Sequence, residues 1–237
     1  MFRSKDIIKY IPEISKNRRD LIIEVGANNG SDTLVFDSLV KDYIILAFEP
    51  DVRAYSKLIS SCKAASNVQV KMAEELLFQT KNNNAIVASQ KAVSNKIGEA
   101  NFFASNSVFK NHENWDMSGS ILEPHNHKKV HGWCKFEEPK LIKTTTLEEA
   151  IAEISADMIE FPTIQFLWID AQGAEKLVLE GLEDYIEFTN YIWTEYNNNE
   201  MYKGQPKRQE LVDLLAGFEV LLDDGDNLLF RNKQLAN

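Results

Sequence analysis

Leu21-Ile-Ile-Glu-Val-Gly-Ala-Asn-Asn-Gly-Ser-Asp-Thr33 begins as an apolar, β-branched run and ends in glycines, asparagines and helix-capping residues. The apolar part is typical of a strand buried on both faces, and the part after it of a tight loop and a helix start, with Ser31 or Asp32 as N-cap. In α/β proteins such a loop lies outside the carboxyl end of a strand, where glycine lets a ligand approach the backbone. We therefore expect a nucleotide-like ligand here.

The rest of the chain alternates between strand and helix patterns. Buried strands are expected at 43–48, 85–88, 166–169 and 191–194, an edge hairpin strand at 100–104, and a closing hairpin at 218–222 and 228–231. Helices are expected at 31–40, 52–59, 146–154, 173–182 and 211–215, the third of them opened by a capping box at Thr146. Residues 68–79 fit strand or helix equally well. This order predicts a Rossmann-like three-layer α/β/α fold with a mostly parallel sheet that ends in an antiparallel hairpin.

The length of 237 residues fits one domain, 1–237. Apolar residues near helical spacing predict an N-terminal helical cover over 1–20, interrupted at Pro12. Residues 105–140 show little periodicity, with isolated aromatic residues among Asn, Ser, His, Gly and Pro. A segment of that length without regular structure is typical of a lid or binding loop, so we expect it to cover the site.

Charge and composition exclude several classes of partner. A formal net charge of -10 argues against nucleic acid, and the short basic cluster from Lys16 to Arg19 is interpreted as a solvated helix end. No apolar run approaches the roughly 20 residues that span a bilayer, and no signal peptide is recognised, so no membrane contact and a cytoplasmic location are expected. Cys62 and Cys134 suit two reduced thiols. A homo-oligomer is compatible with this sequence.

The loop after Gly26 departs from the dinucleotide pattern of glycines. Asn28 stands where that pattern has its second glycine, and Ser31 where it has its third, so the pyrophosphate site is damaged. Glu24, two residues before Gly26, would repel phosphate and attract an ammonium group. Glu49 ends the next strand about 20 residues past the loop, where it can accept hydrogen bonds from both hydroxyls of a ribose. A cationic, phosphate-free cofactor is therefore favoured.

A series of short motifs makes the interpretation more specific. They are Ile23-Glu-Val-Gly-Ala-Asn, Ala47-Phe-Glu-Pro-Asp, Ala92-Val-Ser, Ser118-Gly-Ser-Ile, Thr144-Thr-Thr-Leu and Trp168-Ile-Asp-Ala-Gln-Gly-Ala-Glu. In this order, over about residues 21–220, they resemble the FkbM-type methyltransferases, of the Rossmann-like class I fold. The resemblance implies S-adenosylmethionine as cofactor and methyl transfer to an oxygen, often on a sugar or another small metabolite. It also implies that Asp170 faces the reacting centre and that the cofactor is lined by Glu24, Gly26, Asn29, Glu49, Pro50, Ala92 and Val93. Asn28 and Ser31 depart from the family's glycine-rich pattern, and we expect Ala27 and Ser31 to contact the cofactor as well.

Methyl transfer to a hydroxyl requires that the acceptor lose its proton, which calls for a general base or a metal. Asp170 is the leading candidate because it ends a central strand beside the loop, although it could instead cap the helix that starts near Gly173. Glu195 ends the neighbouring strand and could share this role or form a salt bridge. His127, in the expected lid, is a third candidate base. Glu175 is interpreted as a residue that satisfies a helix dipole.

Two sets of residues have side chains that could bind a metal for the same chemistry. His125, His127 and His131 have the ligand types that suit zinc, and Asp170, Glu195 and Asn197 have those that suit magnesium. A divalent metal is compatible with either set, but we expect none. The expected acceptor contacts are Ser120, His125, Trp133 and Tyr196. The aromatic residues of the lid could form a sugar-stacking wall or a small core of their own.

The sequence is thus interpreted as a methyltransferase that uses S-adenosylmethionine to methylate a hydroxyl of a small-molecule acceptor. Two alternatives remain at this point. One is an NAD-type oxidoreductase on a Rossmann-like fold, which the broken glycine pattern and Glu24 disfavour. The other is a non-catalytic ligand-binding module of the same fold, in which Asp170→Ala would change no activity.

Overall fold

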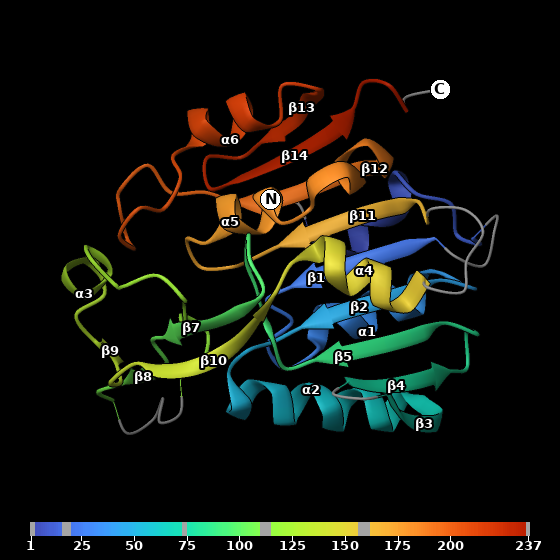
Figure 1. Cartoon of the computed structure of the whole chain (residues 1–237), viewed down its shortest axis with the longest axis horizontal. Coiled ribbons are helices and arrows are strands. Elements are labelled where there is room, and N and C mark those ends of the chain that lie inside the picture. Colours follow the sequence, from blue (N-terminus) through green and yellow to red (C-terminus); the bar gives the residue numbers. More distant parts are fainter. Residues whose placement is uncertain (1–2, 16–19, 73–74, 110–114, 156–161, 236–237) are drawn as a thin grey trace.

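A computed structural model describes residues 3–15, 20–72, 75–109, 115–155 and 162–235. The basic cluster from Lys16 to Arg19 lies outside the described residues, as does part of the expected N-terminal cover. A nine-stranded sheet with the order β13-β14-β12-β11-β1-β2-β5-β4-β3 runs through the middle of the described part (Figure 1). Its strands are β1 (Leu21–Val25), β2 (Ile44–Phe48), β3 (Ser66–Met72), β4 (Glu75–Thr80), β5 (Ala85–Ser89), β11 (Ile164–Ile169), β12 (Thr189–Glu195), β13 (Phe218–Asp223) and β14 (Asn227–Asn232).

The five central strands, from β12 to β5, are parallel, and both edges of the sheet are antiparallel. The predicted closing hairpin is confirmed as β13 and β14, which pair with β12 through β14. The other edge carries a second hairpin, β3 and β4, so the ambiguous residues 68–79 form strands. Val68 and Val70 are about half exposed there, so the sequence pattern does not distinguish a strand from a helix in this segment.

The chain order creates a switch point between β1 and β11. From β1 the chain moves outward through β2 to β5, and it returns to β11 on the other side of β1. Ligands of open α/β sheets bind outside the carboxyl ends of the strands at such a point. Val25 pairs with Ile169 at these ends, so the loop after Val25 and Asp170 after Ile169 lie side by side.

Gly26 is the position where these two strand ends approach most closely. Its φ is +91°, and a Cβ atom built on it would lie 2.0 Å from the carbonyl oxygen of Asp170. Both the left-handed backbone and the contact exclude any side chain, so glycine is required there. The loop therefore holds Asp170 against the end of β1.

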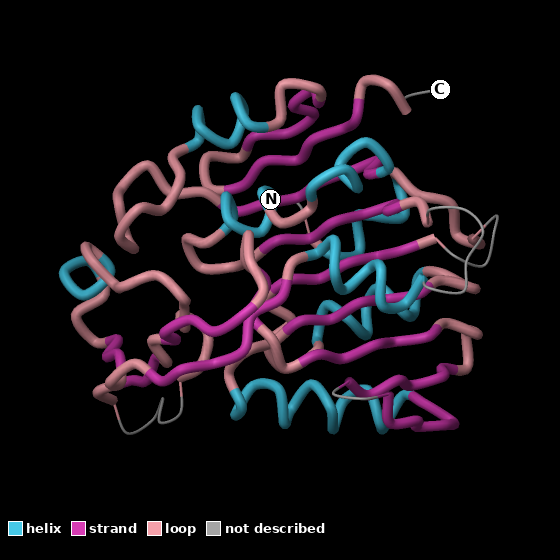
Figure 2. Tube along the Cα trace, viewed as in Figure 1, coloured by secondary structure: helices cyan, strands magenta, loops and turns pink. Residues whose placement is uncertain are grey.

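Helices cover both faces of the sheet (Figure 2), which confirms the predicted three layers. One face packs against η1 (Ser4–Lys9), α1 (Ser31–Leu39) and α2 (Val52–Ala65) through Ile7, Phe36 and Leu58. The other face packs against α4 (Leu147–Ser155), α5 (Glu175–Glu180), η3 (Glu183–Phe188) and α6 (Arg208–Leu214) through Ile151, Val178, Tyr185 and Leu211. No helix in the described ranges is long and apolar enough to cross a membrane.

Two predicted helix starts had different outcomes. The prediction that Ser31 or Asp32 caps α1 was wrong, because Gly30 is the N-cap and makes no side-chain cap. Asn29 is the residue that turns the chain there, since its Oδ1 accepts a hydrogen bond from the Ser31 N–H at 3.0 Å. At α4 the cap is confirmed, with Thr146 Oγ1 accepting from the Glu149 N–H at 3.1 Å.

The expected lid contains more regular structure than the sequence indicated. It includes β8 (Ser105–Ser107), which pairs with β9 (Cys134–Phe136), and the short helix α3 (His127–Val130). The predicted edge strand is β7 (Gly98–Phe102), but it pairs with the distant β10 (Lys140–Thr145), which also pairs with β6 (Ala92–Val93). These elements lie at the carboxyl ends of the parallel strands, on the left of Figure 1.

Candidate functional site

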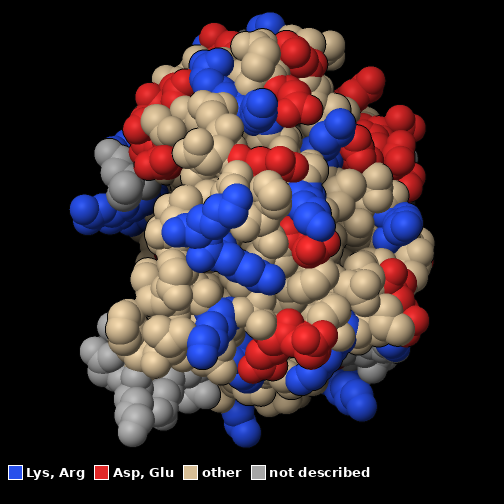
Figure 3. All heavy atoms as spheres, turned by 90° about the vertical axis from the view of Figure 1, so that its left-hand side faces the viewer, with Lys and Arg blue, Asp and Glu red and all other residues tan. Residues whose placement is uncertain are grey.

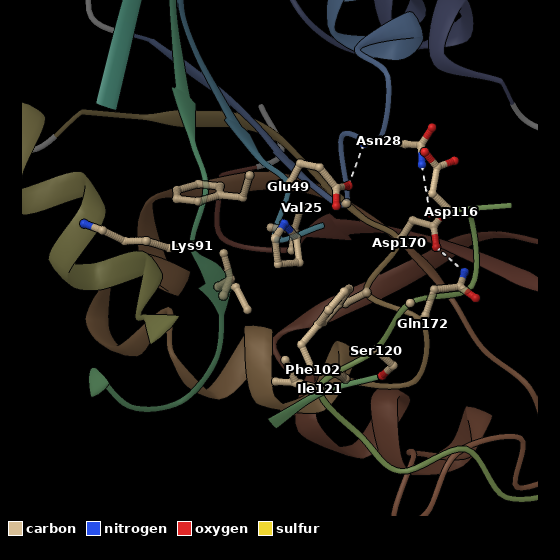
Figure 4. Close-up of a pocket in the computed structure, with 18 of the residues that line it drawn as sticks. Val25, Asn28, Glu49, Lys91, Phe102, Asp116, Ser120, Ile121, Asp170 and Gln172 are labelled. Carbon is tan, nitrogen blue, oxygen red and sulfur yellow. Dashed lines mark hydrogen bonds between the residues drawn. The ribbon is translucent and has the colours of Figure 1, made fainter. Parts of the chain in front are cut away.

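A cavity at the switch point, here called the first cavity, brings together most of the predicted cofactor residues. Its wall includes Gly26, Glu49, Pro50, Ala92 and Val93. Asp170 and the predicted acceptor residue Ser120 line it as well, and Figure 4 shows Glu49, Asp170 and Ser120 around it. The wall contains both acidic side chains, such as Glu49 and Asp170, and apolar ones, such as Val25, Phe48 and Phe102.

Glu49 is held in place by two backbone N–H groups. Its Oε2 accepts from Asn28 at 2.8 Å and its Oε1 accepts from Asp51 at 2.7 Å. Burial raises the pKa of Glu49 to about 8, while the two hydrogen bonds favour the ionised form. The second lone pair of each oxygen remains for a ligand, so Glu49 can accept a pair of neighbouring hydroxyl groups.

The lid is tied to this cavity through Asp116. The Asp116 carboxylate forms an ion pair with Lys57 of α2 at 2.5 Å, and its backbone carbonyl accepts from the Asn28 side chain at 3.1 Å. Arg53, also on α2, donates to the carbonyl of Ser105 at 2.8 Å. Helix α2 and the loop after β1 therefore position the part of the lid that borders the first cavity.

Four residues predicted to contact the cofactor lie outside the lining of the first cavity. Glu24 is 1% exposed, faces α1 and accepts a hydrogen bond from Thr33 at 2.5 Å. Burial raises the pKa of Glu24 well above the ordinary range, which favours its protonated, uncharged form. The expectation that Glu24 attracts an ammonium group is therefore wrong. Ala27 is buried in the core, and Asn29 and Ser31 are exposed at the start of α1.

Asp170 and Glu195 form a hydrogen-bonded carboxyl pair at the ends of β11 and β12. Burial raises the pKa of both groups, and the charge of Asp170 raises that of Glu195 further. A hydrogen bond between two carboxyls needs one proton, and Glu195 is the group that keeps it. The pair thus contains one ionised and one protonated group, which suits proton transfer. Asp170 does not cap α5, whose N-cap is Ala174 without a side-chain cap.

Gln172 connects this pair to the lid. Its Nε2 donates to Asp170 at 2.6 Å and lies 3.5 Å from Glu195, and its Oε1 accepts from the Tyr202 hydroxyl at 3.3 Å. Tyr202 also donates to the carbonyl of Ser118 at 2.8 Å. Gln172 has a φ of +50°, which is uncommon for a residue other than glycine, and such strain is concentrated at functional sites.

A second cavity of about 330 Å³ adjoins the first, and Gln172 lines both. Glu195, His127 and Tyr196, all predicted site residues, line the second cavity. Tyr196 also donates to Asp223 at 2.8 Å. Glu175 lies in the first turn of α5, as predicted, and it also lines this cavity. It accepts from the Gly173 N–H at 3.0 Å, and burial raises its pKa to about 7.

The histidines of the lid do not converge as a set. His127 is buried, with its ring 4.9 Å from that of His131, and burial lowers its pKa to about 4, so it is neutral. Its Nδ1 has no hydrogen-bond partner among the described residues. His125 is exposed and lines neither cavity. In the described part of the chain, no three His, Cys, Asp or Glu side chains are grouped so that they could hold a metal ion.

Trp133, predicted to contact the acceptor, also lies outside both cavities. It is half-buried and packs edge-on against Trp115 with ring centroids 4.9 Å apart. Of the two interpretations of the lid aromatics, this contact favours a small core within the lid. Phe136 likewise packs against His127 at 5.1 Å.

Sequence reasoning missed three residues that build the site: Asp116, Gln172 and Tyr202. Asp116 and Tyr202 reach it from segments without a periodic pattern, so nothing local identified them. Gln172 did carry a signal, because a glycine shortly after a strand end, here Gly173, is typical of a turn with positive φ.

Comparisons with known proteins agree with this geometry. The model of the methyltransferase FkbM domain matches residues 24–220. The 2-O-methyltransferase NoeI of Sinorhizobium fredii (strain NBRC 101917 / NGR234) is 32% identical over 237 residues, which cover 98% of this chain and 87% of that protein. A solved structure, the methyltransferase FkbM of Methylobacillus flagellatus KT, has a TM-score of 0.54 at 11% identity. The match covers 97% of this chain and 48% of that protein, so the chain spans about half of its length. The resemblance found in the sequence motifs is confirmed, and the chain belongs to the FkbM family of methyltransferases.

Proposed function

We propose that this methyltransferase uses S-adenosylmethionine to methylate a hydroxyl group of a small-molecule acceptor. The observation that carries the proposal is the position of Glu49 and the Asp170–Glu195 pair around the switch point. The family match supports the reaction class, and the name of the relative, a 2-O-methyltransferase, supports oxygen as the atom that is methylated.

The residues of the first cavity fit this cofactor. Its wall carries three acidic side chains, from Glu49, Asp116 and Asp170, and one cation, Lys91, which is paired with Glu75 at 3.0 Å. The excess of acidic groups suits a cation and disfavours a pyrophosphate. Glu49 would accept hydrogen bonds from the ribose hydroxyls, while Ala92, Val93 and Phe48 would pack against the base. When bound, S-adenosylmethionine supplies the methyl group and a neutral thioether as leaving group.

The lid would have to shift for the cofactor to enter. The first cavity has a volume of about 90 Å³, well below the roughly 300 Å³ at which small-molecule sites begin. Residues 116–121 of the lid contribute five of the residues that line it. Outward movement of this segment, against the Lys57–Asp116 ion pair, is therefore part of the proposed binding step.

Asp170 is proposed as the general base. It would accept the proton of the acceptor hydroxyl, because Glu195 already holds the single proton of the pair. Gln172 would keep the two carboxyls in register through its amide. His127 is neutral and could accept a proton, but its buried Nδ1 makes it the weaker candidate. No step in this scheme requires a metal.

Calorimetry with S-adenosylhomocysteine, followed by a screen of hydroxylated metabolites with labelled cofactor, tests the proposal. Saturable binding of S-adenosylhomocysteine and a methylated product whose formation Asp170→Asn abolishes are expected. Glu49→Ala should lose binding, and Glu187→Ala, an exposed residue of η3 that lines neither cavity, is the matched control. The proposal fails if no binding is detected at millimolar ligand, or if Glu49→Ala binds as well as the parent protein.

A further inference from the structure

The second cavity has the position that an acceptor site needs. It meets the first cavity at Gln172, and Glu195, the protonated member of the carboxyl pair, belongs to its wall. A molecule that fills it could therefore present a hydroxyl group to the pair. Its volume of about 330 Å³ lies at the lower end of the roughly 300 to 1,000 Å³ of small-molecule sites, which suits a single sugar ring with its substituents.

The acidic side chains of its wall are Glu175, Glu195 and Asp226. Glu195 holds the proton of the carboxyl pair, and Asp170, the ionised member, lies just behind Gln172. Among the described residues that line it, none is Lys or Arg. Lys and Arg side chains do lie on the outer surface of this face, among Asp and Glu side chains (Figure 3), but they are not part of the wall. Burial also keeps His127 neutral, with a pKa lowered to about 4.

The uncharged part of the wall is rich in hydrogen-bonding groups. Gln172, Asn197 and Gln205 contribute amides, and Tyr196 and Tyr202 contribute hydroxyls. Two further polar atoms of the wall residues, Nδ1 of His127 and Oδ1 of Asn227, are buried without a partner among the described residues. Because nearly all buried polar atoms are paired, donor groups of a ligand would relieve this cost after a small rotation of either side chain.

We propose that the second cavity is the acceptor subsite, and that it admits a neutral or ammonium-bearing polyhydroxylated molecule while it excludes phosphorylated and carboxylated ones. This inference rests on the proposed function, because it takes the first cavity as the cofactor site. A phosphate or carboxylate group would meet the acidic side chains of the wall without a Lys or Arg side chain to pair with. Hydroxyl and ammonium groups would donate hydrogen bonds to the carboxyl, amide and hydroxyl oxygens of the same wall.

Saturation-transfer NMR on the full chain, loaded with S-adenosylhomocysteine, tests the selectivity. The probes are glucose, galactose and mannose, each with its 2-amino, uronic acid and 6-phosphate counterpart. We expect binding of neutral or amino members of at least one series, and at least tenfold weaker binding of their anionic counterparts. Equal or tighter binding of the anionic members overturns the proposal, as does the absence of any sugar binding to the loaded protein. If S-adenosylhomocysteine itself does not bind, the proposed function fails first, and this inference with it.

A pair of variants at Asp226 tests the cause of the selectivity. This residue is exposed in the closing hairpin, and its side chain lines the second cavity without belonging to the carboxyl pair. Asp226→Lys should strengthen binding of the uronic acids at least fivefold relative to the matched variant Asp226→Asn, while both keep the parent affinity for S-adenosylhomocysteine. Unchanged discrimination in Asp226→Lys would show that the wall charge does not select the acceptor.

Discussion

The state of Glu49 predicts a specific pH dependence of cofactor binding. In the empty site burial raises the pKa of this carboxyl to about 8, so at pH 7 most molecules carry its proton. The charges of Asp51 and Asp116 act in the same direction. A ribose that donates two hydrogen bonds to Glu49 binds the ionised form, and binding must therefore release a proton at neutral pH.

The magnitude follows from the ionised fraction. With a pKa of about 8, roughly 1% of Glu49 is ionised at pH 6 and about 90% at pH 9. The affinity should rise nearly tenfold per pH unit from pH 6 to about 7.5 and level off above about 8.5, a total of about 90-fold, or about 2.7 kcal/mol. At pH 7 about 0.9 proton should be released per ligand bound.

The suitable ligand is 5′-methylthioadenosine, because it keeps the ribose and lacks the amino acid part, which titrates in this range. Calorimetry at four pH values, each in two buffers with different ionisation enthalpies, measures affinity and proton release together. Glu49→Gln is the matched control and should bind weakly with little dependence on pH. A flat affinity between pH 6 and 8.5 in the parent protein, without proton release, would refute the reasoning.

Three further predictions concern stability, the lid and the carboxyl pair. Gly26→Ala should destabilise the fold by more than about 2 kcal/mol in denaturant unfolding, whereas Gly225→Ala, also at positive φ but in open space, should cost only about 1 kcal/mol. Lys57→Met removes the ion pair to the buried Asp116 and should change the affinity for S-adenosylhomocysteine severalfold, whereas Lys203→Met, which removes an exposed pair, should leave it unchanged. Gln172→Leu should lower kcat at least tenfold and shift the pH profile of kcat/KM, because its amide donates to the carboxyl pair. Binding of S-adenosylhomocysteine should be kept. An unchanged pH profile would contradict the proposed role of the amide.

The sheet and the cofactor side of the site could be predicted because their signals are local. The run from Leu21 to Val25 is apolar apart from Glu24, and Glu49 directly follows another apolar run, so each pattern indicates a strand and where that strand ends. The β3–β4 hairpin could not be predicted, since exposed Val68 and Val70 remove the contrast between its two faces.

Glu24 shows a different limit. Every residue of β1 is buried, so the sequence contains no contrast that indicates which face each side chain points to. The two faces differ only in the helices that cover them, and Glu24 points to the face covered by α1, where Thr33 donates a hydrogen bond to it. The carboxyl is thus a buried partner of the helix that follows the loop, and Glu49 and Asp170 remain as the acidic groups at the cavity.

The strained backbone at Gln172 connects these observations. The Asp170–Glu195 pair needs a donor that reaches both carboxyls, and the first residue after Ala171 reaches them only if the chain turns sharply at the end of β11. The left-handed conformations of Gln172, φ +50°, and Gly173, φ +96°, supply this turn. Strain of this kind, on the order of 1 to 3 kcal/mol, persists only where the surroundings enforce it. Here the Tyr202 hydroxyl contacts Gln172 Oε1 and the Tyr202 ring packs over Gly173, so the loop between β12 and α6, which borders the second cavity, also holds Gln172 against the carboxyl pair.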